Sequence, residues 1–219
     1  DGEVHVHKTG STLGVVNLRG NGLWCYEPNV MGETCQIYWR SWYIYGSKGI
    51  DLKGNDQVID YMYSEDVASK QADNRNVTSS SAATLTMKAT ASKWSNCAFN
   101  NKVSVTFAPA SAATSYMATN STSTMTGTLT VSNGTFKLAG NTTFNKLGAL
   151  DVCSGATFEV ASTSANPLGS GTVSVKLVTG ASLILPENAV LSAKELWVDG
   201  VRKEGGTYTH ANLPQLPDN

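Results

Sequence analysis

One short phrase that occurs three times constrains the fold of this 219-residue chain more than any other feature of its sequence. It reads TLTVSNGTFKL from Thr128, ALDVCSGATFEV from Ala149 and SVKLVTGASLIL from Ser174. In each copy two apolar residues stand two positions apart, a glycine follows, and a second apolar pair comes after a short polar step. A spacing of two is typical of a strand with one buried face, and glycine permits a sharp turn. Each copy therefore predicts two short strands joined by a turn.

The spacing of the copies predicts how these strands are arranged. The copies align on Gly134, Gly155 and Gly180, which are 21 and 25 residues apart. A repeat of this length without helical periodicity is typical of a solenoid, in which stacked coils share a core and pair through parallel strands. A β-sandwich is the alternative, but it gives no reason for the repeat. Ten apolar residues should point inward: Leu129, Val131, Phe136, Leu138, Leu150, Val152, Phe158, Val160, Leu183 and Leu185.

The rest of the chain shows weaker forms of the same alternation. ATLTMKA from Ala83 and KVSVTFAP from Lys102 each place apolar residues at alternate positions, which predicts further coils. The Ser/Thr-rich stretch 110–125 is expected to be a loop. We therefore predict a single β-solenoid domain over residues 1–219, with irregular, aromatic-rich N-terminal coils (1–73), repeat coils (83–185) and a C-terminal cap (193–210).

The cap is predicted from a turn signal near the end of the chain. Asp199 and Gly200 lie between two apolar segments, a pattern typical of a two-residue β-hairpin. The last coil of a solenoid exposes its core and its strand edges, which this hairpin would cover. Trp197 and Tyr208 are expected to lie over that coil, and the residues around Pro214 are expected to form a polar tail.

Composition restricts the classes of partner. Only 15% of the residues are charged and the net charge is -1, which argues against nucleic-acid binding. No apolar run reaches the ~20 residues of a membrane-spanning helix, so membrane insertion is not expected. We expect no cofactor and no metal, because His5 and His7 lack a third ligand nearby in the sequence.

The four cysteines form no CxxC pair, which argues against a zinc site. Cys25 and Cys35 flank a turn-rich stretch and could form a disulfide. The alternative is that all four cysteines, with Cys97 and Cys153, are small buried apolar residues.

GTLTVSNGTFKLAG and the closing LWVDGVRKEGGTYT resemble the autotransporter-associated β-strand repeats of large secreted bacterial proteins. The resemblance covers roughly residues 127–210. It implies a right-handed parallel β-helix located outside the cell or at the cell surface. It also implies a role as an adhesin, or as a non-catalytic part of a glycan-degrading enzyme, with glycans or other domains of a larger protein as partners.

The segment 23–46 concentrates aromatic residues in a chain that is 8% aromatic. Planar aromatic side chains beside an arginine can stack on sugar rings and hydrogen-bond their hydroxyl groups. The alternative is that these rings form an N-terminal cap or pack under a loop. The candidate carbohydrate-binding residues are Trp24, Tyr38, Trp39, Arg40, Trp42 and Tyr43.

No catalytic residue is assigned from the sequence. Two functions remain open: a non-catalytic, structural or adhesive module, and a polysaccharide-degrading lyase or glycoside hydrolase or the C-terminal part of one. Carboxylates near one another in the sequence would serve the enzyme, which needs a spaced pair or a calcium site. These carboxylates are Asp51, Asp56, Asp60, Glu65 and Asp66. The Thr, Ser and Lys residues on the outer side of the repeat favour the first function.

Overall fold

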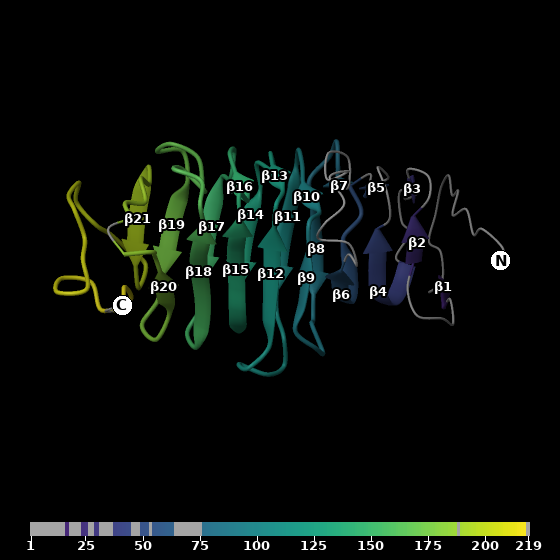
Figure 1. The fold of residues 1–219 in the computed structure, drawn as a ribbon, viewed down its shortest axis with the longest axis horizontal. Coiled ribbons are helices and arrows are strands. Elements are labelled where there is room, and N and C mark those ends of the chain that lie inside the picture. The colour runs from purple at the N-terminus through teal and green to yellow at the C-terminus, as the bar shows by residue number, and fades with distance from the viewer. Residues whose placement is uncertain are drawn as a thin grey trace.

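A computed structural model describes residues 16–17, 23–25, 29–30, 37–44, 49–52, 54–63, 76–187 and 189–217. Within these ranges side chains are described for 51–52, 54–59, 62, 76–187 and 189–217. The described chain is all-β, without a helix, and winds into a parallel β-solenoid of about 6 turns (Figure 1). The parallel β-helix that the repeat predicts is therefore confirmed. The division of the chain into three segments stays a prediction.

The largest sheet, which we call the long sheet, has 11 strands and runs the length of the solenoid. All its pairings are parallel except the last, between β21 and β22. Its strands are β1 (Val16–Asn17), β2 (Leu23–Cys25), β4 (Ile37–Ile44), β6 (Gln57–Tyr63), β8 (Ala83–Met87), β11 (Val103–Phe107), β14 (Thr128–Val131), β17 (Ala149–Val152), β19 (Ser174–Leu177), β21 (Glu195–Val198) and β22 (Val201–Arg202).

Two further faces complete each coil. The second sheet consists of β9 (Lys93–Ser95), β12 (Ser115–Thr119), β15 (Gly134–Gly140), β18 (Ala156–Ser162) and β20 (Ser182–Ile184). The third face consists of β3 (Asn29–Val30), β5 (Gly49–Asp51), β7 (Asn76–Thr78), β10 (Ala98–Phe99), β13 (Thr122–Ser123) and β16 (Thr143–Phe144). Each step along the sequence from one face to the next turns the chain around a shared core.

The strand register confirms the alignment of the three copies. Equivalent residues lie opposite each other from coil to coil: Leu129, Leu150 and Val175 on the long sheet, and Phe136, Phe158 and Leu183 on the second sheet. The glycines turn the chain between these strands, with φ values of 66° at Gly134, 75° at Gly155 and 83° at Gly180. Only glycine adopts such backbone angles at little cost.

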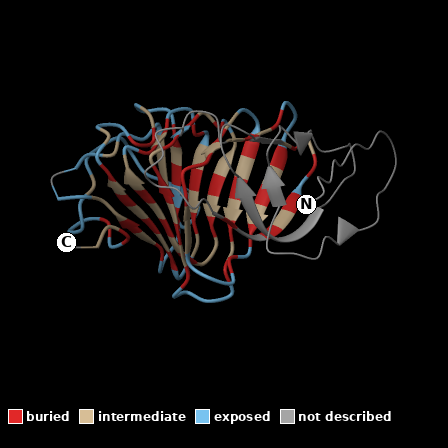
Figure 2. Ribbon diagram, turned by 45° about the vertical axis from the view of Figure 1, so that its right-hand side comes forward, coloured by how far each residue is buried: buried red, intermediate tan, exposed pale blue. Residues whose placement is uncertain are grey.

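The core is continuous from Leu52 to Leu213 and consists of side chains at alternate strand positions. Figure 2 shows the result as alternating buried and half-buried bands across strands such as β8, β11 and β18. Of the ten residues expected to point inward, nine are buried, and Leu185 is half-buried against the same core. At about 25 cal/mol per Å² of apolar surface, this burial is the main term that stabilises the coils.

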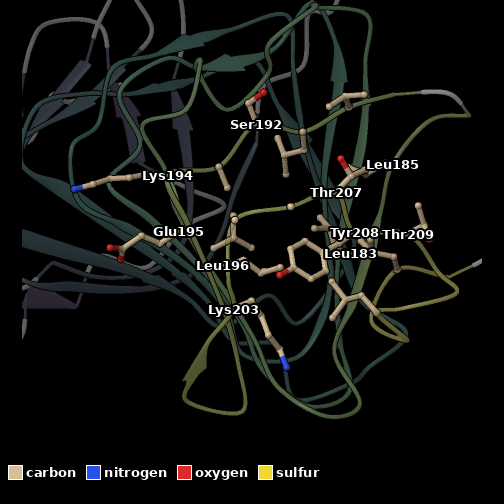
Figure 3. A pocket seen from close by; sticks show the side chains of 18 of the residues that line it. Leu183, Leu185, Ser192, Lys194, Glu195, Leu196, Lys203, Thr207, Tyr208 and Thr209 are labelled. Carbon is tan, nitrogen blue, oxygen red and sulfur yellow. The ribbon is translucent and has the colours of Figure 1, made fainter.

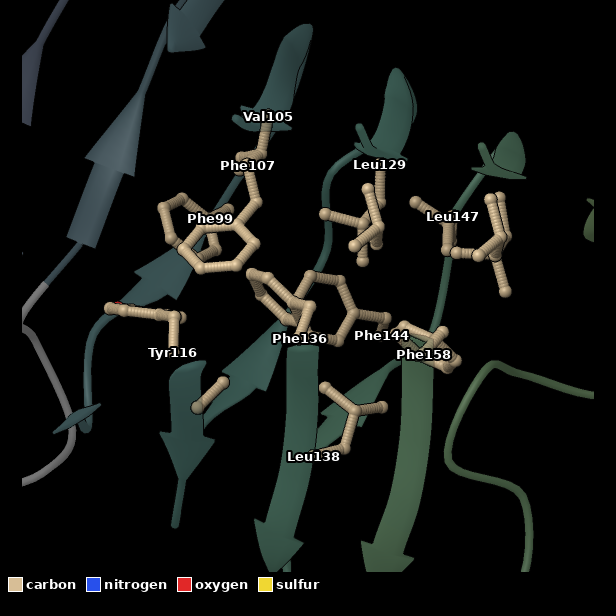
Figure 4. Packing of buried hydrophobic residues seen from close by; sticks show 14 of the residues in the cluster. Phe99, Val105, Phe107, Tyr116, Leu129, Phe136, Leu138, Phe144, Leu147 and Phe158 are labelled. Carbon is tan, nitrogen blue, oxygen red and sulfur yellow. The ribbon is translucent and has the colours of Figure 1, made fainter. Parts of the chain in front are cut away.

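Aromatic rings stack along the middle of the core (Figure 4). Phe136 is the centre of this group, because its ring lies 6.2 Å from Phe158 and 5.3 Å from Tyr116, measured between centroids. It also meets Phe107 edge-on at 6.0 Å. Stacked and edge-to-face pairs contribute about 0.5–1.5 kcal/mol each beyond their buried area. An aromatic side chain at one of these repeated positions thus stabilises both its own coil and the next coil.

Two predictions for segments outside the repeat copies are wrong. The stretch 110–125 is not a loop, because it contains β12 and β13, and Tyr116 and Ala118 point into the core. The end of the chain is not a polar tail, because Leu213 and Gln215 are buried. The backbone N–H of Leu183 donates to the carbonyl of Gln215 at 2.8 Å, so this segment lies against β20 at the edge of the second sheet.

The predicted hairpin is present and closes the long sheet. β21 and β22 pair in antiparallel register, with Asp199 and Gly200 as the two turn residues. Tyr208 is half-buried against the core of the last coil, as expected. Trp197 does not pack against that core, which corrects the prediction, because it lies opposite the exposed Lys176 on the outer side of the sheet. The cap is therefore made by the hairpin together with residues 208–216.

Candidate functional site

The aromatic segment that the sequence singles out lies on β2 and β4, at the N-terminal end of the long sheet. β4 pairs with β2 on one side and with β6 on the other, so that Trp39 lies opposite Ile59 and Trp42 opposite Met62. Trp24, Tyr38, Arg40 and Tyr43 are on the same two strands, but the side chains of all six candidates lie outside the described residues. Their contact with carbohydrate stays a prediction.

The outer faces of the two main sheets carry side chains aligned from coil to coil. On the long sheet one such row consists of Thr86, Thr106, Thr130, Asp151, Lys176 and Trp197. On the second sheet another row consists of Trp94, Met117, Lys137, Glu159 and Ile184. Parallel strands hold these rows about 4.7–4.9 Å apart per coil. Both faces are thus extended, regular and mostly uncharged.

Charged side chains on these faces pair between successive coils. The ammonium group of Lys137 contacts the carboxylate of Glu159, and that of Lys176 lies 3.5 Å from Asp151. Near the cap, the guanidinium group of Arg202 lies 3.3 Å from Glu195. Half-exposed pairs of this kind contribute at most about 1 kcal/mol each, because water screens them. Their main effect is to neutralise charge along the face.

Two of the carboxylates that the sequence proposes for catalysis, Asp51 and Asp56, have described side chains. Asp56 is exposed and accepts a hydrogen bond from the backbone N–H of Thr84 at 2.7 Å, which ties β6 to β8. Asp51 lies at the end of β5 on the third face. The side chains of Asp60, Glu65 and Asp66, and the pair His5 and His7, lie outside the described residues. Among the described residues no group of three His, Cys, Asp or Glu could hold a metal ion.

The side chain of Asp199 joins the hairpin to the preceding coil through hydrogen bonds. Its carboxylate accepts hydrogen bonds from the backbone N–H of Thr179 at 2.7 Å and from the Thr179 hydroxyl at 2.8 Å. These bonds, backbone N–H first, lower the pKa of Asp199 below its ordinary value, and nearby Lys203 acts in the same direction. The carboxylate is therefore a structural group of the cap.

Neither Cys97 nor Cys153 forms a disulfide. Cys97 is buried in the core and Cys153 is half-buried. Of the proposed disulfide, Cys25 lies on β2 and Cys35 lies outside the described residues, so that pairing stays a prediction. Near Cys97, burial raises the pKa of the Tyr116 hydroxyl, with a smaller contribution from the thiol. Tyr116 is thus neutral and acts as part of the core.

A cavity of about 600 Å³ opens at the C-terminal end of the solenoid, between the last coil and the segments that cover it. Figure 3 shows Leu183, Leu196 and the ring of Tyr208 near its middle. The charged ends of Lys194 and Lys203 are directed away from that middle. The sequence did not predict this cavity, since its walls combine the last repeat copy with segments that have no repeat.

Comparison of the chain with protein-family models, with curated proteins and with solved structures finds no match. Separately, the described residues include no helix long and apolar enough to cross a membrane.

Proposed function

We propose that this chain is a non-catalytic β-solenoid module of a secreted or cell-surface protein, which presents an extended face to glycans. The observation that carries the proposal is the alignment of outward side chains across successive coils of the long sheet. A polysaccharide is itself a periodic, uncharged and hydroxyl-rich polymer, and a regular face of hydroxyl groups and neutralised charges matches it chemically.

The described acidic side chains support a non-catalytic role. Glu159 and Asp151 pair with lysines of adjacent coils, while Asp56 and Asp199 accept hydrogen bonds from backbone N–H groups. A glycosidase needs two carboxyl groups facing each other a few ångströms apart across the substrate. Carboxylates that are already used to join one coil to the next fit a structural function better.

Aromatic residues supply the strongest contacts in the proposed glycan interface. An indole ring stacks on the CH groups of a sugar ring, which gives more binding energy than a hydroxyl contact exposed to water. Trp39 and Trp42 on β4 are our main candidates, because they lie within the aromatic segment. Trp94 on β9 lies in a row of the second sheet and serves as a matched control.

Affinity electrophoresis through gels that contain single polysaccharides tests the proposal. We expect one glycan to retard the native protein, and we expect the Trp39→Ala/Trp42→Ala variant to regain free mobility while Trp94→Ala does not. Thermal unfolding of each variant shows that it is folded.

Other results would separate the alternatives. A cleared zone at the protein band would identify a polysaccharide-degrading enzyme. Unretarded migration in every glycan would reject glycan binding and leave a structural spacer. Loss of retardation in Trp94→Ala alone would move the interface to the second sheet.

A further inference from the structure

The cavity at the C-terminal end exists because the solenoid core stops there. Within the repeat, each inward residue is covered by its equivalent in the next coil, as Phe136 is by Phe158. After the last coil the segments 189–196 and 202–216 pack over the core, but they leave a cavity between themselves and that coil. Leu183 and Leu196 therefore border a space rather than another coil. Leu185 and Leu196 are only half-buried for the same reason.

We propose that this end cavity is a binding site for an uncharged aliphatic molecule with one hydroxyl end, such as a medium-chain alcohol. Its volume of about 600 Å³ lies within the roughly 300–1,000 Å³ of small-molecule pockets. The side chains at its middle are apolar, so transfer of an aliphatic chain from water is favourable. The site is independent of glycan binding on the outer faces.

Tyr208 determines which polar end fits. Its hydroxyl donates a hydrogen bond to the carbonyl of Glu204 at 2.6 Å, which fixes the ring and uses the phenol's only proton. The phenol oxygen can then only accept a further hydrogen bond. An alcohol can donate a hydrogen bond to the phenol oxygen. A carboxylate has no proton to donate, so its oxygens would face the lone pairs of the phenol oxygen. The site should therefore prefer an alcohol to the fatty-acid anion of the same length.

Two glycines at the rim leave the entrance open. Gly205 and Gly206 are exposed, and a Cβ atom at either position would meet no atom within 4 Å. Neither has a positive φ, so a larger residue can be introduced without backbone strain. Gly206→Trp is thus expected to narrow the entrance without disturbing the fold. Ala112→Trp, at an exposed turn between β11 and β12, is the matched control.

The test uses the full chain with ¹³C-labelled leucine methyl groups, titrated with 1-octanol and, separately, with octanoate. We expect saturable shifts confined to the leucines of the cavity, with Leu129 and Leu150 in the middle of the core unchanged. The dissociation constant for octanol should rise at least tenfold in Gly206→Trp and stay the same in Ala112→Trp. Tyr208→Phe should reduce the preference for octanol over octanoate.

Three results would overturn the proposal. The first is a linear response up to the solubility limit of octanol. The second is an equal response at Leu129 and Leu150, which would show general partition into the core. The third is an unchanged dissociation constant in a Gly206→Trp protein whose other resonances show that it is folded. Tighter binding of octanoate than of octanol would refute the role given to Tyr208.

Discussion

A buried residue of this chain packs against its own equivalents in the neighbouring coils. Phe136 contacts Phe158 in the next coil and Tyr116 in the preceding one. The same relation holds for Leu129 and Leu150 on the long sheet. One side chain therefore contributes to the stability of two coils, and its loss affects both.

Replacement of Phe158 by alanine tests this double role. Phe158 is fully buried, so the change leaves a cavity and should lower the free energy of unfolding by about 3–5 kcal/mol. Thr157→Ala, at the adjacent outward position, should change it by less than about 0.5 kcal/mol. Urea unfolding followed by circular dichroism measures both values. A loss under ~1 kcal/mol for Phe158→Ala would contradict the packing that we describe.

The Asp199 carboxylate makes the cap sensitive to acid. The pKa of Asp199 is lower in the folded chain than in the unfolded chain, where it is near the ordinary value of about 3.9. The hydrogen bonds from Thr179 to its carboxylate therefore stabilise the cap fully at pH values above this unfolded pKa. This contribution is lost as the pH falls through the lower, folded pKa. NMR titration of the carboxyl carbon should show a midpoint below that of a free aspartate peptide. A Thr179→Ala variant, which keeps only the backbone donor, should shift the midpoint upward.

The sequence predicts inward residues well wherever the repeat is intact. Positions two apart, repeated from coil to coil, leave only one face for Leu150, Val152 and Phe158 to occupy. It fails at Gln215, which composition assigns to a polar tail. Gln215 is buried because its backbone pairs with Leu183, a contact between segments that share no pattern.

The length of a strand decides whether it could be predicted from the sequence. Strands of four or five residues, such as β14 and β11, show alternation and were predicted. Three strands of the third face, β10, β13 and β16, were not predicted, because they have two residues each and two residues cannot show a period. β12 was missed because it lies in a stretch rich in Ser and Thr, a composition that resembles a loop.

The hairpin of β21 and β22 depends on its turn, where φ is 50° at Asp199 and 76° at Gly200. A β-branched residue in this left-handed region costs roughly 1–2 kcal/mol, so Gly200→Val should open the hairpin locally. Amide hydrogen exchange of β21 and β22 should become faster, while exchange in β14 and β17 stays unchanged. Gly205→Val, at a position without a positive φ, is the control. Faster exchange throughout the solenoid would show that the hairpin is not a local unit.

At the scale of the whole molecule, the cap separates the apolar core from water at one end. Truncation after Leu185 would remove it and leave β19 and β20 with unpaired edges. Free edges of parallel strands pair with other chains, so the truncated protein should form larger species than the full chain. Light scattering after size-exclusion chromatography measures this. A chain truncated after Leu216 keeps the buried tail and should behave like the full chain. The same oligomeric state for all three proteins would show that the cap does not protect the edge.

The end cavity shows the limit of prediction at this scale. Its walls combine Leu183 from the repeat with Leu196 from the hairpin and Tyr208 from the segment after it. Nothing in the spacing of these residues relates them, because the cavity forms where the repeat ends. The aromatic segment is the opposite case, since composition alone singled it out.

The antiparallel strand β22 lies where the stack of parallel strands in the long sheet stops. A parallel solenoid can in principle lengthen without limit, one coil after another, by about 4.7–4.9 Å each time. A strand of reversed direction gives the next coil no matching edge, so growth ends at a defined coil. The length of the solenoid is therefore set by the number of coils that precede the hairpin.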